Sequence, residues 1–369
     1  MAFSALQIGN DELSTRSEHH AHYQKAAREL SCYTASMESN ADPSPTGLQF
    51  ALATVFFLSY SDLLTNHVNE AQALLKNASA LIRASKSREL MTAEKRLISW
   101  IRLVDGRASS AGGDGTFLTA TEDAAYSPDQ QPKPMESAAS PWKASRNADS
   151  DIEEILFDVL YVPGLIFYQR VQTIMARVSN IDPWHRSRGT VEDETEVMAI
   201  ASNVSSDLQA LERQRPALMD HAVAGSLTER HLALDIAAAI TRSYRTYWAN
   251  YEAGFVYLHR VAHKHLPATA DVLRARSTIK RIARLFEQGQ EPLPVNFIWP
   301  LLMACCEEDD VLERVWMIQA IRGMQSMASN ARPIADVLEE VHRRQDTTKQ
   351  RADVRQASMD LFNMSFAVV

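Results

Sequence analysis

The spacing of apolar residues along the chain predicts helices. Between residues 48 and 63 they recur at every third or fourth position, which places them on one face of a helix. The buried stripe predicted for this helix comprises Leu48, Leu52, Val55, Ser59 and Leu63, widened by Phe56 and Tyr60. Residues 67–85 predict an antiparallel partner with Val68, Ala71, Leu74, Leu75, Ala78 and Ile82 facing inward. A few polar residues separate the two segments, so together they predict a helical hairpin.

The same spacing predicts helices at 19–37, 94–104, 152–178, 191–215, 227–263, 268–287, 311–327 and 333–344. Leu97, Ile101 and Val104 mark the buried side of the third predicted helix, 94–104, which should stop at Asp105-Gly106. Ser150 with Glu153 and Ser226 with Glu229 are capping-box candidates for two later helices. Pro163-Gly164 predicts a break or kink inside the segment 152–178.

The helix at 227–263 is the longest that the pattern predicts. Its apolar and aromatic stripe is typical of a central core helix rather than of a cofactor site. The stripe comprises Leu234, Ala238, Ile240, Tyr244, Tyr247, Trp248, Tyr251, Phe255, Leu258 and Val261. The stripes of the last two helices comprise Val311, Val315, Ile318 and Ile321, and then Ile334, Val337, Leu338 and Val341. We expect the core, and any pocket, around the 227–263 helix and the region from Trp299 to Trp316.

These patterns predict an all-α fold. No sustained alternation of apolar and polar residues indicates a strand, and no fixed repeat indicates a solenoid. We expect one large multi-helix domain of packed helical hairpins, without a sheet, at 48–346. A polar N-terminal segment with a short helix precedes it at 1–47, with residues 1–18 frayed, and a C-terminal tail follows at 347–369. Residues 121–149 are rich in Pro, Ser, Gln and Asp and predict a disordered loop.

Charge and cysteine content narrow the class of protein. The chain has 369 residues and a formal net charge of -8, so bulk charge does not attract nucleic acid. Any DNA contact requires a local basic segment or another polypeptide. Three cysteines indicate a reducing compartment, and the adjacent Cys305 and Cys306 favour packing in an apolar helix over a redox or metal role. We find no secretory signal and no apolar stretch of about 18 residues, so we expect a cytosolic or nuclear protein that does not span a membrane.

The search for reactive groups yields no catalytic, cofactor or metal residue. The glycine-rich segment 112–116 lacks the Lys of a phosphate-binding loop, and no serine stands in a strand–helix elbow. His19, His20 and His22 form a solvated cluster, and His259 and His263 lack the Glu of a zinc-protease motif. The acidic run Glu307 to Asp310 suits the first turn of a helix better than acid–base catalysis. Among the basic residues near the C-terminus, a solvated helix end is favoured over a nucleic-acid contact for Arg343, Arg344, Lys349 and Arg351.

Three segments resemble the fungal-specific transcription factor domain, the regulatory half of zinc binuclear cluster activators. The first is RLISWIRLVDGRASS at 96–110, followed by glycines at 112, 113 and 115. The second is FIWPLLMACCE at 297–307, which is similar to the Trp-Pro-Leu segment that precedes an acidic patch in the family. The third is VLEEVHRRQD at 337–346, similar to the family's closing helix. Each string by itself is common, but their shared order and spacing are specific.

The resemblance implies a nuclear transcriptional regulator, with control of a fungal metabolic or secondary-metabolite gene cluster. The implied partners are other transcription factors or a second copy of the chain, together with a small-molecule effector. The family's DNA-binding module needs six closely spaced cysteines, and Cys32 is the only cysteine in the first 300 residues. We therefore expect contact with DNA only indirectly or through a zinc-cluster module that this chain lacks. The chain is then a paralogue without the module, the product of an incomplete gene model, or a partner of a complete factor.

Two other classes of function stay open at this point. A dimeric scaffold of the same fold would hold a complex together without activating transcription. An all-helical enzyme would need ionisable side chains gathered in a pocket, and the candidates are Tyr244, Tyr251, Glu252 and His259. We expect a regulator without catalytic activity and without a cofactor.

Overall fold

The structure is a computed structural model that describes residues 13–38, 45–65, 67–85, 90–110, 117–118, 155–183, 188–230 and 232–363. Every regular element in these ranges is a helix, so the predicted all-α fold without a sheet is confirmed. The loop predicted at 121–149, the capping box predicted at Ser150 and the glycine-rich segment 112–116 lie outside the described residues.

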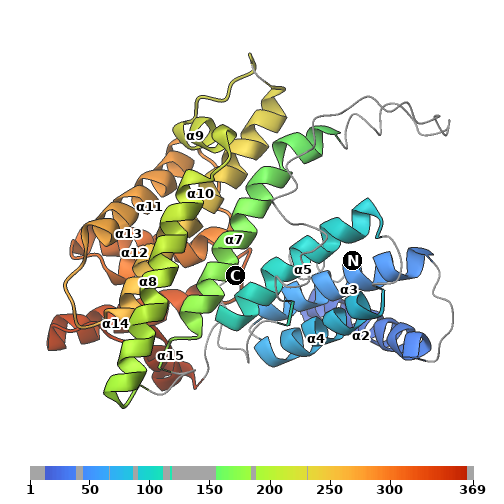
Figure 1. The fold of residues 1–369 in the computed structure, drawn as a ribbon, viewed down its shortest axis with the longest axis horizontal. Coiled ribbons are helices and arrows are strands. Elements are labelled where there is room, and N and C mark those ends of the chain that lie inside the picture. The colour runs from blue at the N-terminus through green and yellow to red at the C-terminus, as the bar shows by residue number, and fades with distance from the viewer. Residues whose placement is uncertain are drawn as a thin grey trace.

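The first helices form a group on one side of the molecule (Figure 1). α3 packs against each of the other three, and the group comprises α2 (Leu13–Glu38), α3 (Pro45–Leu64), α4 (Val68–Ala84) and α5 (Thr92–Ser110). The α3–α4 hairpin was predicted from spacing, and the five residues of the α3 stripe from Leu48 to Leu63 are all buried. Residues 13–18, expected to be frayed, are part of α2. The observed helix therefore extends beyond both ends of the range predicted from the sequence, 19–37.

α3 also corrects one expectation. Its segment Gly47–Leu64 is long and apolar enough to cross a membrane by length and composition, although the sequence analysis found no such stretch. More than half of this segment is buried inside the fold. Leu52, Val55 and Leu63 are fully covered, which is typical of a core helix that packs on several neighbours.

α7 (Val162–Ser179) joins this group to the rest of the chain (Figure 1). It packs on α5 on one side and on α8 and α10 on the other. The predicted break near Pro163 is observed as an interruption of the helix at Tyr161, whose φ of -103° and ψ of -41° stay in the right-handed helical region, and α7 starts with Pro163 in its first turn. Gly164 is needed there, since a Cβ atom would lie 2.7 Å from Cζ of Tyr244 on α10.

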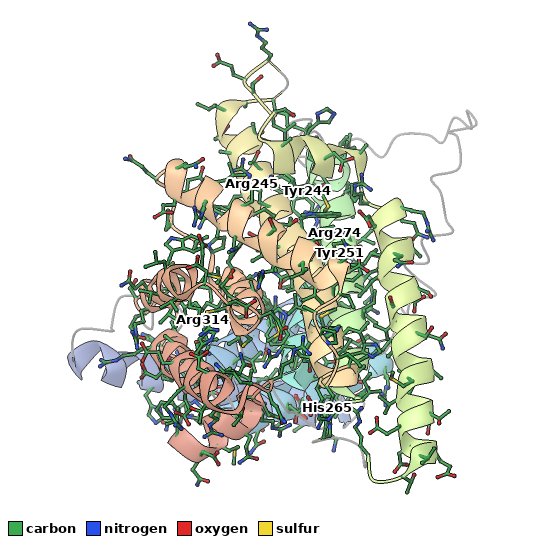
Figure 2. The ribbon with its side chains drawn as sticks, turned by 90° about the vertical axis from the view of Figure 1, so that its left-hand side faces the viewer. Tyr244, Arg245, Tyr251, His265, Arg274 and Arg314 are labelled. Carbon is green, nitrogen blue, oxygen red and sulfur yellow. The ribbon has the colours of Figure 1, made fainter. Side chains whose placement is uncertain are left out.

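The remaining helices surround α10 (Leu234–Ala262), the longest of the described helices at 29 residues. α11 runs beside α10 in Figure 2, where Tyr244 and Tyr251 mark α10 and Arg274 marks α11. The others are α8 (Val191–Arg213), α9 (Ala217–Ala224), α11 (Ala270–Gln288), the 3₁₀ helix η2 (Val295–Phe297), α12 (Ile298–Cys306), α13 (Val311–Arg322), α14 (Ala331–Thr348) and α15 (Val354–Phe362). α15 lies within the segment expected to be a tail, and its Ala357 is buried.

The end of α5 differs from the prediction for a reason of tertiary structure. α5 continues through Asp105-Gly106 to Ser110. Gly106 serves close packing, because a Cβ atom there would lie 3.3 Å from Cβ of Gln172 on α7. The Asp105 carboxylate accepts hydrogen bonds from the backbone N–H groups of Phe117 and Leu118, at 2.8 Å each.

The capping box predicted at Ser226 and Glu229 is wrong. α10 begins only at Leu234, and Ala233 precedes it without a side-chain cap. Ser226 instead closes the end of α9, where Gly225 adopts a left-handed φ of 71°. The backbone N–H of Ser226 donates to the carbonyl of His221 at 2.9 Å. Ser226 therefore completes α9 and does not start α10. Leu234 and Ala238, predicted to be core residues, are exposed at this end of α10.

The stripe predicted for α13 is half wrong. Ile318 and Ile321 are buried as predicted, but Val311 and Val315 are 64% and 46% exposed. The buried face of α13 is formed by Met317, Ile318 and Ile321, because α12 and α14 cover the helix only on that side. α14 matches its prediction, with Ile334, Val337, Leu338 and Val341 all buried.

A buried carboxyl group links α2 to α3 and makes the stability of the protein depend on pH. The hydroxyl of Tyr23 donates a hydrogen bond of 2.8 Å to the Asp62 carboxylate. Burial raises the pKa of Asp62 to about 7, although the Tyr23 hydrogen bond opposes the shift. Because the pKa of Asp62 is higher in the folded protein than in the unfolded chain, the contribution of Asp62 to the free energy of unfolding is fully present below the unfolded pKa. It is lost as the pH rises toward 7.

We expect Asp62→Asn to stabilise the protein at neutral pH. The amide oxygen still accepts from Tyr23, but no buried charge forms. The gain should grow between about pH 4 and pH 7, level off above that, and reach roughly 2 kcal/mol. Urea unfolding at several pH values measures it. An advantage of the same size at every pH would show that the charge of Asp62 is not the cause.

Candidate functional site

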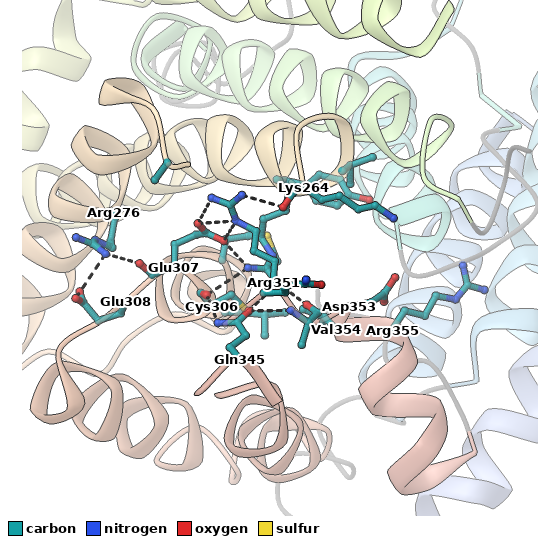
Figure 3. A pocket seen from close by; sticks show the side chains of 18 of the residues that line it. Lys264, Arg276, Cys306, Glu307, Glu308, Gln345, Arg351, Asp353, Val354 and Arg355 are labelled. Carbon is teal, nitrogen blue, oxygen red and sulfur yellow. Dashed lines mark hydrogen bonds and ion pairs between the residues drawn. The ribbon is translucent and has the colours of Figure 1, made fainter. Parts of the chain in front are cut away.

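A cavity of about 1050 Å³ lies beside the second half of α10. It is bordered by α10, the segment 263–268, α12, α14 and α15, and Figure 3 shows its polar side. Trp299 of α12 contributes an apolar wall and packs edge-on against Tyr257 of α10, with ring centroids 5.0 Å apart. The other apolar lining residues include Val261, Leu273, Leu302, Met303, Ile334, Val337 and Val354. A pocket near Trp299 was expected from the sequence, and the structure places one there.

A buried ion network is built around Glu307, at the end of α12. Arg260 from α10 and Arg351 from the segment between α14 and α15 both bind its carboxylate. The side chains of Arg260, Glu307 and Arg351 are only 8%, 6% and 15% exposed. Burial alone would raise the pKa of Glu307. The hydrogen bonds from Arg351 and the charge of Arg260 outweigh burial and hold the pKa below its usual range.

Arg351 also fastens the segment between α14 and α15 to the end of α10. Its guanidinium donates to the backbone carbonyls of Lys264, at 3.1 Å, and of Leu266. Arg260 completes the connection by donating to the carbonyl of Ala352 at 2.7 Å. Gln345 of α14 donates to the carbonyl of Cys306 at 3.0 Å. The C-terminal ends of α10, α12 and α14, with the segments that follow them, thus meet around Glu307 (Figure 3).

A second ion group surrounds Glu308, one residue further along the chain. Lys280 of α11 binds its carboxylate at 2.6 Å, and Arg276 lies 3.7 Å from it. The same carboxylate accepts from the backbone N–H groups of Asp309 and Asp310. Burial acts against ionisation, but the hydrogen bond from Lys280 leads the groups that lower the pKa of Glu308. Glu307 and Glu308 therefore stay ionised at neutral pH.

The acidic run from Glu307 to Asp310 thus has two roles, of which the sequence analysis found one. Asp310 caps α13, as a charged first turn should, by accepting from the N–H groups of Leu312 and Glu313. Glu307 and Glu308 point into the protein and bind cations. Their pairing with Arg and Lys fits binding and structural cohesion rather than proton transfer, because a lowered pKa makes each carboxylate a weak base and leaves no proton to donate near neutral pH.

Several residues weighed from the sequence lie apart from the cavity. None of Tyr244, Tyr251, Glu252 and His259, the candidates of the enzyme interpretation, lines it. The hydroxyls of Tyr244 and Tyr251 donate to the backbone carbonyls of Leu160 and Leu208, at 3.1 Å each. Glu252 lies 3.4 Å from Arg274. These side chains serve helix packing along α10 and do not converge on one point.

The described histidines and cysteines that were weighed as metal or redox residues do not form such a site either. The rings of His259 and His263 lie 5.6 Å apart, and among the described residues no group of three or more potential ligands is arranged around a metal position. His20 and His22 are exposed on α2, and the side chain of His19 lies outside the described residues. Cys305 and Cys306 are buried in α12, and burial raises the pKa of the Cys306 thiol to about 11. Both cysteines are packing residues, as predicted.

The basic residues near the C-terminus require a correction. Arg343 and Arg344 lie on the surface side of α14 and pair with Glu340, as expected for a solvated helix end. Arg351 was assigned to the same solvated patch but is buried on Glu307. Arg260 and Gln345 were also missed, because no local pattern marks polar residues that bond across 47 and 39 positions.

The three strings quoted for the family resemblance occupy two places in the structure. The second and third supply Trp299, Glu307 and Gln345 to the cavity. The first lies in α5 and buries Arg107, whose guanidinium donates to the Tyr168 hydroxyl of α7 and, at 2.7 Å, to Asn250 of α10. Arg107 therefore connects the N-terminal helices to the central helix.

Comparison with models of protein families matches residues 1–364 to the model described as "Fungal specific transcription factor domain". No curated protein and no solved structure gives a significant match. The family match covers the whole cavity and both ion groups. It also includes α2 and all of α15, which lie outside the range 48–346 over which the resemblance was predicted.

Proposed function

Because this chain belongs to the fungal-specific transcription factor domain family, we propose that it regulates the genes of a metabolic pathway in response to a small-molecule effector. The family is regulatory and not enzymatic, and a role in transcription follows from membership. The pathway genes, the effector and a nuclear location are the further steps of the proposal. Contact with DNA would be made by another polypeptide or a zinc-cluster module.

The cavity beside α10 is the observation that supports an effector. Its volume of about 1050 Å³ is in the upper part of the range found for small-molecule sites. Apolar walls from α12 and α14 face the paired charges around Glu307 and Glu308, a combination that holds the body of a ligand and orients its polar groups. The cavity is lined by residues of seven helices, α7 and α10 to α15, and by the segment 263–268, so occupancy would alter their packing together.

A cavity-blocking variant tests this role. Ala268 is partly buried in the cavity wall, and Ala268→Trp should fill part of the space. We expect deletion of the gene to alter a defined group of transcripts, and Ala268→Trp to abolish the response of that group to growth conditions. Ala73→Trp, on the exposed face of α4, is the matched control and should leave the response intact.

The same strains decide between the proposal and a scaffold. Unchanged transcripts after deletion, together with a stable dimer of the purified chain, would favour the scaffold of the same fold. If deletion alters transcripts but Ala268→Trp responds normally, the role in transcription would stand and the assignment of the cavity as an effector site would be contradicted. The purified chain should not bind DNA specifically, because its net charge is -8. Tight and salt-resistant binding to one DNA sequence would contradict that expectation.

A further inference from the structure

A second hollow, of about 350 Å³, lies between α11 and α13, on the face of the molecule that Figure 2 presents. We call it the α11–α13 groove. Its apolar lining includes Ala283, Leu293, Trp316, Ala320, Met324 and Met327. The guanidinium of Arg284 of α11 lies 4.9 Å from the centroid of the Trp316 ring and pairs with Glu313.

The apolar surface continues from the groove along α13. Leu312 is 79% exposed and lies one helical turn before Trp316, on the same face. Val315, at 46% exposed, widens this strip. Of these two residues, Val315 belongs to the stripe that sequence spacing predicted to be buried, and Leu312 does not. A strip of large exposed apolar side chains that leads into a hollow is typical of a site for another macromolecule.

The charged side chains that line the groove are negative. They are Glu287 and Glu291, and neither forms an ion pair with a cation in the part of the chain that the structure describes. Arg284 pairs with Glu313, and Arg322 pairs with Asp336 and Glu339. Arg245 of α10, whose charge acts on Glu291, is not among the residues that line the groove. An occupant with positive charge beside its apolar face therefore fits this site best.

We propose that the α11–α13 groove binds a basic amphipathic helix of a partner protein. The apolar face of the helix lies against Trp316, Ala320 and Met327, and its Lys or Arg side chains reach Glu287 and Glu291. Recognition of this kind uses apolar anchors one and two turns apart on the bound helix. The chain's net charge of -8 adds long-range attraction for a basic partner. The proposal does not depend on the effector cavity.

Two exposed apolar faces of a second copy fit the groove less well, because carboxylates stand beside them. Val191 and Met198 of α8 are flanked by Glu192 and Glu196, and Ile155 and Val159 by Asp158. These faces would bring negative charge toward Glu287 and Glu291, which opposes binding.

Fluorescence anisotropy with two synthetic helical peptides of about 18 residues tests the proposal. Both carry Leu along one face, flanked by Lys in one peptide and by Glu in the other. We expect the purified chain to bind the Lys peptide at least about tenfold more tightly than the Glu peptide. Equal binding of the two peptides would overturn the role of Glu287 and Glu291.

Gly323→Leu tests the groove itself. A Cβ atom at Gly323 would meet only its own helix, at 3.4 Å from the Ala320 carbonyl and 3.5 Å from the Gln319 carbonyl. The added side chain can therefore extend into the groove without disturbing the core. We expect at least about tenfold weaker binding of the Lys peptide, and unchanged thermal unfolding would show that the fold is intact. Binding at wild-type strength would overturn the proposal.

Charge reversal provides a matched pair of variants. Glu287→Lys with Glu291→Lys should abolish the preference for the Lys peptide, whereas Glu192→Lys with Glu229→Lys changes the net charge equally on exposed positions elsewhere and should preserve it. If both double variants lost the preference for the Lys peptide equally, the preference would depend only on net charge and not on Glu287 and Glu291. A concentration-dependent dimer that Gly323→Leu dissociates would assign the groove to a second copy and overturn the proposed partner.

Discussion

Glu307→Ala is expected to lower the free energy of unfolding by about 3–5 kcal/mol, the cost of removing one partner from a buried ion pair. The variant leaves two buried guanidiniums, those of Arg260 and Arg351, facing each other without their shared carboxylate. It also loosens the segment between α14 and α15, which Arg351 holds to the end of α10. Urea unfolding followed by far-ultraviolet circular dichroism measures the loss.

Two further variants test whether the charge and the burial of the Glu307 carboxylate cause this loss of stability. Glu307→Gln keeps an acceptor but removes the charge, so it should fall between the wild type and Glu307→Ala. Because the folded pKa of Glu307 is lowered, its contribution is present above the unfolded pKa near 4.5 and is lost as the pH falls below it. The wild-type advantage over Glu307→Gln should therefore shrink in acid. Asp309→Ala removes a neighbouring carboxylate whose side chain is 96% exposed and should change little. Similar losses in Asp309→Ala and Glu307→Ala would contradict the importance of burial.

Arg107→Ala is the second variant with a large expected effect, also about 3–5 kcal/mol, because it combines a cavity with unpaired polar groups. Arg107 is 6% exposed, and its loss leaves the Tyr168 hydroxyl and the Asn250 side-chain oxygen without this donor. These groups come from α5, α7 and α10, so the contact between the N-terminal helices and the central helix should weaken. Hydrogen exchange should show faster exchange in α3 and α5 than in α10 and α11.

Arg107→Met provides the informative comparison. Methionine retains most of the side-chain volume but donates no hydrogen bond. A stability close to that of Arg107→Ala would assign the effect to the lost donor, and a stability close to wild type would assign it to packing. Arg177→Ala is the surface control, since Arg177 is 41% exposed and paired with Asp207. Its loss should be no more than about 1 kcal/mol. A loss for Arg107→Ala within that range would contradict a structural role of the buried guanidinium.

Local spacing in the sequence was sufficient to determine the fold class and most helices. The stripes of α3 and α14 were predicted residue by residue, since one face of each helix is covered along its length. A regular stripe of this kind depends only on the 3.6-residue period of the helix and on which residues are apolar. The family could also be identified from the sequence. Each of the three strings that carry the resemblance is a contiguous segment, so it can be recognised without knowing which segments pack together.

The cavity and the groove were decided by tertiary structure. Glu307 meets Arg260 across 47 positions and Arg351 across 44, and nothing near any of the three predicts the others. Val311 and Val315 have the spacing of core residues, but they are 64% and 46% exposed, because none of the helices that the structure describes covers them. Gly106 resembles a helix stop and is instead a point of close contact with α7. Periodicity states which residues can share a face, whereas burial and charge pairing depend on which distant segment packs against that face.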